Sequence, residues 1–370
     1  MSDNKAPGTV GATTPSPKGS KQGSPKSPKT QSPAGMLPGE HWIQAAEELA
    51  AEDDDHDSAL GDDDVDGSTA SISSSILQYR TIHGRTFHSE RGDAHSWIPN
   101  DEKQNESMDI NHHLLTLSLG NKLHLAPLKK DIEKALDIGT GTGIWAIDFA
   151  DEYPNTEVIG TDISPIQPTW VPPNLTFEIE DCTRQWTFPA DSIDYVHMRY
   201  LFGSIADWGA LFKEAFRVCK PGGTVESYEA STAFESDDGS VSDTSAMNEW
   251  AKLFTRGGKL LGRPFTVLEE DMQRKYMEDA GFVDIQVWDF KAPVGGWPRD
   301  PKLKEIGRFA QLALEQDYEG YVLYMADIAL GWGATEVGAY CALLRREIRS
   351  GKHHPYYRQR VVWGRKPESS

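Results

Sequence analysis

The sequence lacks the features that direct a chain into a membrane or into secretion. Nowhere in its 370 residues is there an uninterrupted apolar run of about 18 residues, the length that a membrane-spanning helix needs. The hydrophilic N-terminus has no apolar segment of the kind found in a secretory signal. Only three cysteines occur, Cys182, Cys219 and Cys341, without the paired spacing of a metal site or a disulfide. We therefore expect no membrane span, no metal and a reducing compartment inside the cell.

Positive charge is also scarce. The net charge is −20, with 37 basic and 57 acidic residues, which argues against direct binding of nucleic acid through its phosphates. Residues 30–79 contain no Lys or Arg, and eight aspartates crowd into 53–66. We interpret residues 1–78 as a disordered tail, basic and rich in Ser, Pro and Lys at first and acidic later, because it has too little apolar surface to offset the entropy of ordering. Residues 41–50 form a short predicted helix within it, one that could dock on a partner.

Beyond the tail, apolar strands alternate with helices. Strands are expected at 135–138, 157–161, 175–179, 192–197, 224–228, 283–287 and 360–363. Helices are expected at 101–126, at 208–218 before a Pro221-Gly222-Gly223 turn, from a capping box at 266–269 to Gly281, and over 302–349. This alternation predicts a parallel sheet with right-handed crossovers, which binds ligands at the carboxyl ends of its strands. The long helical stretch is an insertion between the last two strands, expected over the mouth of the active site.

The segment ALDIGTGTGIWAIDFA, residues 135–150, predicts the ligand. It reads as a strand, a turn with Gly139, Gly141 and Gly143, and a helix, so that backbone N–H groups approach a ligand at a helix N-terminus. Dinucleotide sites use G-x-G-x-x-G, but here the third glycine comes one residue early. The pattern D-x-G-x-G-x-G instead resembles motif I of class I S-adenosylmethionine (SAM) methyltransferases. A glycine turn that binds nothing is the alternative.

Residues at the strand ends suit the parts of SAM. Asp137 can bind the ammonium group directly or through water, and Asp162 can accept from both ribose hydroxyls. Asp181 can accept from the adenine amine while the Cys182 N–H donates to a ring nitrogen. Arg199 can orient either the SAM carboxylate or the substrate. Several such residues together are stronger evidence than any one strand-end carboxylate.

Other motifs resemble one family, the fungal LaeA-like methyltransferases, over about residues 79–367. These motifs are LDIGTGTGIWAIDFA, VIGTDISPIQPTWVPPN, GRTFH before a helix with His112 and His113, PGG before an acidic strand with Glu226 and Glu229, and the final VVWGRKP. The resemblance implies a Rossmann-like class I fold with a seven-stranded, mostly parallel sheet. It implies an N-terminal helical cap at 79–126 and a SAM-dependent methyltransferase domain at 127–370, with a helical lid at about 297–350. The predicted cofactor-binding residues are Tyr79, Arg85, Asp137, Gly139, Thr140, Gly141, Gly143, Asp162, Ile163, Asp181, Cys182 and Arg199.

The resemblance further implies nuclear regulation of secondary metabolism and development, in a complex with a velvet-domain protein, and location in nucleus and cytoplasm. Three hypotheses stay open. The leading hypothesis is that the chain methylates a protein, or itself, within such a complex. The second is a small-molecule O- or N-methyltransferase of secondary metabolism, in which the helical insertion encloses a dry apolar pocket lined by residues such as Trp332 and Tyr340. The third is a SAM-binding regulatory subunit with little turnover.

The sequence identifies no clear catalytic base. Methyl transfer is a displacement on an activated methyl group, which an enzyme accelerates largely by positioning and by excluding water. A base is needed only where the acceptor has a proton to lose. The predicted catalytic residues are His197, near a strand end, and His113. Because His113 shares an expected apolar helix face with Ile110, Leu114 and Leu117, a core histidine is its alternative reading.

Overall fold

The computed structural model describes residues 35–50, 79–89 and 96–368, all within one compact unit, Ser32–Ser370. The strands are β1 Arg80–Ile82, β2 Arg85–Phe87, β3 Lys134–Ile138, β4 Glu157–Asp162, β5 Leu175–Ile179, β6 Ile193–Arg199, β7 Cys219–Ala230, β8 Val283–Pro293 and β9 Tyr356–Arg365. The helices are α1 Gly39–Ala50, α2 Glu102–Ser118, α3 Ile144–Glu152, α4 Trp208–Val218, α5 Ala246–Leu261, α6 Met272–Ala280, α7 Pro301–Gln316, α8 Tyr318–Tyr324, the π-helix η1 Met325–Ala329 and α9 Ala334–Arg349.

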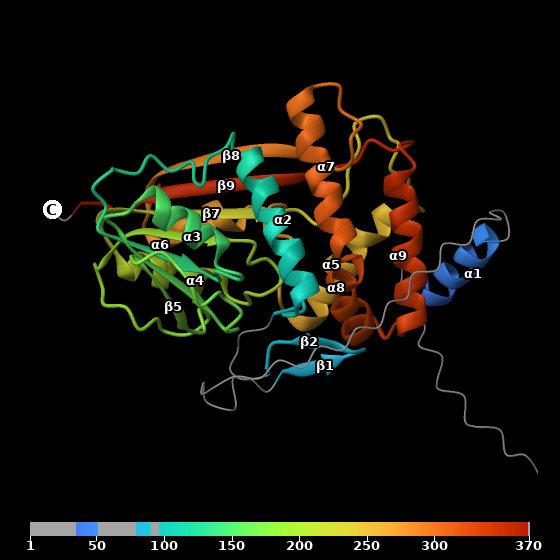
Figure 1. The fold of residues 1–370 in the computed structure, drawn as a ribbon, viewed down its shortest axis with the longest axis horizontal. Coiled ribbons are helices and arrows are strands. Elements are labelled where there is room, and N and C mark those ends of the chain that lie inside the picture. The colour runs from blue at the N-terminus through green and yellow to red at the C-terminus, as the bar shows by residue number, and fades with distance from the viewer. Residues whose placement is uncertain (1–34, 51–78, 90–95, 369–370) are drawn as a thin grey trace, which may run out of the picture. The chain divides into compact units, whose positions relative to one another are not determined.

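Seven strands form one sheet in the order β5-β4-β3-β6-β7-β9-β8 (Figure 1). The strands β5, β4, β3, β6 and β7 run parallel, and β9 runs antiparallel to both of its neighbours. Alternate residues of β3 face opposite sides: Ala135 packs with α3, whereas Leu136 belongs to the larger core that includes α4. Burial on both faces explains why the central strands β3 and β6 are largely apolar. The predicted Rossmann-like fold with a mostly parallel sheet is confirmed.

The helical insertion also lies where it is predicted. Helices α7, α8 and α9, with η1, occupy the chain between β8 and β9, and α7 packs along α2 (Figure 1). Helix α5, which precedes α6, was not predicted; it begins at its N-cap Ser245, whose hydroxyl accepts from the Asn248 N–H at 3.1 Å. The insertion and α5 together wall the cavity described below.

Three predicted boundaries are wrong. Helix α2 ends at Ser118 rather than 126, because Gly120 and Asn121 take positive φ. The Pro-Gly-Gly segment lies inside β7, which begins at Cys219. The predicted capping box forms a turn, and α6 begins only at Met272.

The predicted tail also contains structure, since α1 packs against α9 in the same chain (Figure 1). The rest of the proposed tail, 1–34 and 51–78, lies outside the described residues.

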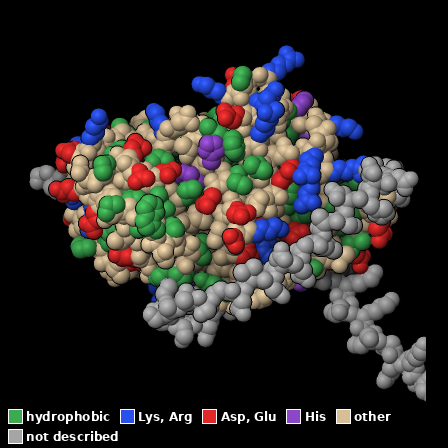
Figure 2. Space-filling view, in the orientation of Figure 1, with side chains coloured by type: hydrophobic (Ala, Val, Ile, Leu, Met, Phe, Trp, Pro, Cys, Tyr) green, Lys and Arg blue, Asp and Glu red, His purple; other side chains and the backbone are tan. Residues whose placement is uncertain are grey.

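None of the helices in the described ranges has the length and apolar character to cross a membrane. Acidic and basic side chains are interspersed on the face shown in Figure 2, and hydrophobic side chains are exposed there in small groups. Trp170, in the family-specific SPIQPTWVPPN segment, is 90% exposed.

Candidate active site

The glycine turn after β3 borders a cavity of about 260 Å³ at the carboxyl ends of the parallel strands. Gly141 and Gly143 have φ of +59° and +83°, a region that side chains with a Cβ rarely adopt. A Cβ on Gly141 would lie 2.4 Å from Met108 Cε, and one on Gly143 would lie 2.3 Å from Phe177 Cζ. The turn therefore needs glycine for both its backbone conformation and its close packing. Gly139, Thr140, Gly141 and Thr142 line the cavity.

Asp162, at the end of β4, shapes the turn as well as facing the cavity. Its carboxylate accepts from the Gly141 N–H through Oδ2 and from the Ser164 N–H through Oδ1, both at 2.9 Å. Burial raises the pKa of Asp162 to about 6, although these backbone N–H groups lower it. The carboxylate is thus held rigidly beside the turn, where a diol can donate to its remaining lone pairs.

Asp137 does not line the cavity, so its position does not support a direct contact with the ammonium group, and the predicted contact through water stays a prediction. Asp137 accepts from Thr140 Oγ1 at 2.6 Å and lies 2.7 Å from His197 Nδ1, and its side chain is only 4% exposed. The pairing of β3 with β6 places Asp137 directly opposite His197. Asp137 therefore acts from beneath the turn, fixing Thr140 and His197.

His197 is equally enclosed. Its ring stacks on Trp145 with centroids 3.6 Å apart, and burial lowers its pKa to about 4. His197 does not border the cavity. Its catalytic role stays a prediction, and this enclosed position argues against it.

His113 is exposed on α2 and contacts Phe309 edge to face. The buried member of the pair is His112, so the prediction that His113 lies on the apolar face is wrong by one residue.

Arg199, at the end of β6, is the cation of the cavity wall. Its Nη1 lies 3.2 Å from His112 Nδ1, and burial lowers its pKa. Within the described ranges, no carboxylate is at salt-bridge distance from its guanidinium. A partly buried cation that makes no salt bridge is costly, so this position suits the carboxylate of the amino-acid end of SAM.

Asp181, the third acid predicted to contact the cofactor, is engaged by neighbouring residues instead of the cavity. Asp181 Oδ1 accepts from the backbone and the hydroxyl of Thr183, and Oδ2 lies 3.3 Å from Arg184 Nε. Asp181 does not line the cavity, whereas Cys182 and Ile163 do. Burial raises the pKa of the Cys182 thiol to about 12, so this side chain is neutral at the cavity wall.

Tyr79 and Arg85 are not at the cavity either. Tyr79 lies half-buried just before β1. Arg85 forms bidentate pairs with Asp101 and with the fully buried Asp317, at 2.5 to 2.9 Å. Its donors are therefore engaged in joining β2 to α2 and α8. Their predicted cofactor contacts are not supported by these positions.

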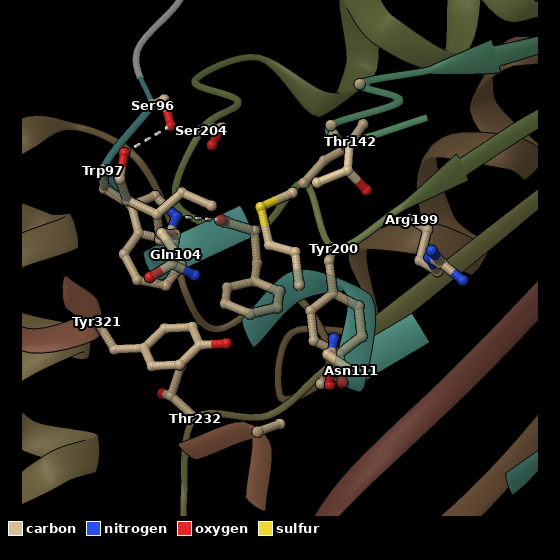
Figure 3. Close-up of a pocket in the computed structure, with 18 of the residues that line it drawn as sticks. Ser96, Trp97, Gln104, Asn111, Thr142, Arg199, Tyr200, Ser204, Thr232 and Tyr321 are labelled. Carbon is tan, nitrogen blue, oxygen red and sulfur yellow. Dashed lines mark hydrogen bonds between the residues drawn. The ribbon is translucent and has the colours of Figure 1, made fainter. Parts of the chain in front are cut away.

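We call the part of the cavity beyond the turn the acceptor chamber. An apolar pocket beside the insertion was predicted, but its predicted lining residues Trp332 and Tyr340 do not border this cavity. In Figure 3, Thr142 and Arg199 lie at one end, and Trp97, Gln104 and Tyr321 lie at the other. Its walls are mostly apolar, and its aromatic lining residues are Trp97, Tyr200, Phe202, Phe234, Trp250, Phe254, Tyr321 and Tyr357. These side chains come from six separate segments of the chain. No group of three or more potential metal ligands occurs among the described residues.

Sequence reasoning missed the contribution of α2 to this chamber. Gln104, Met108 and Asn111 all line it, and their spacing of i, i+4 and i+7 places them on one helix face. That spacing was a usable signal. Glu229, in the acidic strand after Pro-Gly-Gly, is fully buried, and its carboxylate accepts from the backbone N–H groups of Leu201 and Phe202, both at 3.0 Å. It thereby holds two cavity-lining residues in place.

A family model described as "Methyltransferase domain" matches residues 110–287. "Methyltransferase pytC" of Aspergillus terreus is 34% identical over 305 residues, which cover 82% of this chain and 93% of the relative. "Secondary metabolism regulator LAE1" of Cochliobolus heterostrophus is 33% identical over 292 residues, or 77% of this chain and 94% of the relative.

Among solved structures, Haemonchus contortus phosphoethanolamine N-methyltransferase 2 in complex with SAM is 21% identical, with 71% of this chain and 53% of the other covered. Its TM-score of 0.39 is too low to carry an argument. The two relatives instead match this chain over nearly their whole length at more than 30% identity. The chain therefore belongs to the fungal LaeA-like family of class I SAM-dependent methyltransferases.

Proposed function

We propose that this methyltransferase transfers the methyl group of SAM to a mostly apolar small molecule of secondary metabolism, held in the acceptor chamber. The observation that carries the proposal is the continuity of one cavity, from the glycine turn and Arg199 to a chamber walled by aromatic rings. Ligand pockets for small molecules are mostly apolar, with a few polar groups that fix orientation. The name of the relative from Aspergillus terreus, a methyltransferase, is consistent with this proposal.

We assign the cofactor to the turn end of the cavity. The backbone of Gly139 to Thr142 approaches its amino-acid end, and Arg199 pairs with its carboxylate. Asp162 accepts from the ribose hydroxyls, and Ile163 and Cys182 border the adenine. When bound, SAM supplies an activated methyl group on a sulfonium cation. The rings of the chamber can stabilise positive charge through their faces while they exclude water.

The chamber offers hydrogen bonds for orienting an acceptor. Gln104 is fully buried, and Asn111, Thr232 and Tyr321 also line the cavity. The Tyr321 hydroxyl lies 2.8 Å from Ser107 Oγ, and burial raises its pKa to about 12. A tyrosine with such a pKa is neutral near pH 7, so it orients an acceptor rather than removing its proton.

A second candidate is methylation of a protein in a nuclear regulatory complex with a velvet-domain protein. It is supported by relatives that carry the name of secondary metabolism regulators. On this proposal the chain is present in nucleus and cytoplasm and affects development as well as metabolism. A related possibility within the same complex is a regulatory subunit that binds SAM but has little turnover.

One experiment separates these proposals. Deletion strains carrying the wild-type gene, Ala310→Trp or Gly141→Asp are fed methionine with a labelled methyl group, and labelled metabolites and proteins are compared. Ala310 is a small residue of the chamber wall, so the tryptophan fills the chamber while the cofactor end stays open. We expect a labelled metabolite that disappears in both variants, with S-adenosylhomocysteine binding kept only in Ala310→Trp. A labelled protein with no labelled metabolite contradicts the first proposal. Normal function of Gly141→Asp indicates the regulatory subunit.

A further inference from the structure

We propose that His112 and Asp148 position Arg199 for the carboxylate of the cofactor, so that His112 is a positioning residue of the cofactor site. The inference rests on the cofactor placement proposed above. It concerns three side chains from three elements: His112 from α2, Asp148 from α3 and Arg199 from β6. On this proposal, neither the Asp148 carboxylate nor the His112 imidazole touches the cofactor.

The contacts define a chain of hydrogen bonds. His112 Nε2 lies 2.9 Å from Asp148 Oδ2, and His112 Nδ1 lies 3.2 Å from Arg199 Nη1. A guanidinium can only donate, so Nδ1 must accept and carries no proton. The proton of the neutral ring is therefore on Nε2, where it donates to Asp148. The two partners thus select one tautomer of His112.

Burial supports the neutral ring. His112 is 4% exposed, and desolvation lowers its pKa. A neutral acceptor can hold the guanidinium in one orientation without neutralising it, as a carboxylate in the same place would do. The positive charge of Arg199 remains available to an anion that enters the cavity.

Helix α2 couples this arrangement to the glycine turn. Thr142 Oγ1 donates to Asp109 Oδ1 at 2.7 Å, one helical turn before His112. Helix α2 therefore contacts the turn that approaches the amino-acid end of SAM. It also carries His112, which orients Arg199. Asp148 is about half exposed on α3, so it can be changed without opening the core.

The test compares two ligands by calorimetry on the full-length protein. S-adenosylhomocysteine carries the amino-acid end, whereas 5′-methylthioadenosine has the same thioether and nucleoside without it. We expect His112→Leu to raise the Kd of S-adenosylhomocysteine about tenfold, the effect of losing a charge-assisted hydrogen bond. The Kd of 5′-methylthioadenosine should change less than twofold. His112→Asn should recover most of the affinity, since its amide oxygen can accept from Arg199.

Matched variants keep the test decisive. His113→Leu removes the adjacent histidine, which contacts Phe309 instead, and should leave both affinities unchanged. Asp148→Ala should weaken S-adenosylhomocysteine alone, by a smaller factor, and gives a surface variant if His112→Leu fails to fold.

Equal weakening of both ligands, or of neither, overturns the proposal, and so does unchanged S-adenosylhomocysteine binding in Arg199→Met. No acceptor enters these measurements, so an error in the proposed function appears only in the labelling experiment.

Discussion

Asp137 and Asp162 end neighbouring strands, yet they contribute differently to the site. Asp162 faces the cavity and accepts from the backbone of the turn. Asp137 is enclosed below the turn, with one oxygen engaged by Thr140 and the other by His197. The same residue type at equivalent strand ends thus serves binding in one case and support in the other. Burial of His197 has a measurable consequence for stability.

We expect the unfolding free energy of the wild-type protein to fall by about 2 kcal/mol between pH 7.5 and pH 5 because of His197 alone. Its pKa in the fold is about 4, below the value near 6.5 of an unfolded chain. As the pH falls through 6.5, His197 binds a proton in the unfolded state but not in the folded state. Protonation therefore favours the unfolded state and lowers the free energy of unfolding. His197→Asn keeps a donor toward Asp137 but does not titrate.

Urea denaturation of both proteins at pH 7.5 and pH 5 gives the change in unfolding free energy of each. Subtracting the change in His197→Asn from that in the wild type leaves the contribution of His197, because the other titrating groups are common to both proteins. The same pH dependence in His197→Asn and wild type would contradict the burial argument.

At the scale of elements, α2 joins the cofactor end of the molecule to the inserted helices. Asp109 on α2 accepts from Thr142 of the turn, and Ser107 donates to the Ala313 carbonyl of α7 at 2.6 Å. At the start of α2, Arg85 bridges the N-cap Asp101 to Asp317 at the start of α8. Arg85 therefore stabilises the arrangement of these helices, and its pKa is raised by its two carboxylate partners.

Arg85→Leu should lower the unfolding free energy by about 3 kcal/mol, because it leaves the buried carboxylate of Asp317 without its main partner. The Kd of S-adenosylhomocysteine for the folded protein should stay within twofold of wild type, since Arg85 does not line the cavity. Denaturant unfolding and calorimetry give the two quantities.

Lys103→Leu is the matched control. Lys103 Nζ lies 3.4 Å from the same Asp317, but its side chain is 50% exposed, so its loss should cost less than about 1 kcal/mol. A large loss of ligand affinity in Arg85→Leu would restore the predicted cofactor role.

At the scale of the whole molecule, an N-terminal helix is part of the folded unit. Trp42 of α1 is 2% exposed and meets Tyr340 of α9 edge to face, with centroids 5.1 Å apart. The Leu37 N–H donates to Glu249 Oε1 of α5 at 2.9 Å. Both α5 and the insertion wall the acceptor chamber, so α1 covers the outer side of elements that form the site.

Removal of residues 1–50 should therefore lower the unfolding free energy by about 3 kcal/mol, the usual cost of losing a buried tryptophan. Removal of residues 1–34 alone should change it by less than about 0.5 kcal/mol, because that segment has the composition of a solvated tail. Thermal or denaturant unfolding of the two truncated proteins beside the full chain tests this. Equal stability of the two truncations would show that α1 contributes nothing.

Local sequence determined the parts of this protein that depend on neighbouring residues. The order of strands and helices, the glycine turn and Asp162 at a strand end all follow from periodicity, φ preferences and the geometry of parallel sheets. These features were sufficient to predict the fold class, and the resemblance of the turn to motif I of class I methyltransferases predicted the cofactor.

Only the tertiary structure decided which side chains face the cavity. The rotation of α2, about 100° per residue, put His112 inside and His113 outside. Strand register paired Asp137 with His197, 60 residues away, and a contact across 232 residues engaged Arg85 with Asp317. The aromatic lining of the acceptor chamber comes from six distant segments. Its lining depends on how helices and loops pack, which short-range patterns do not encode.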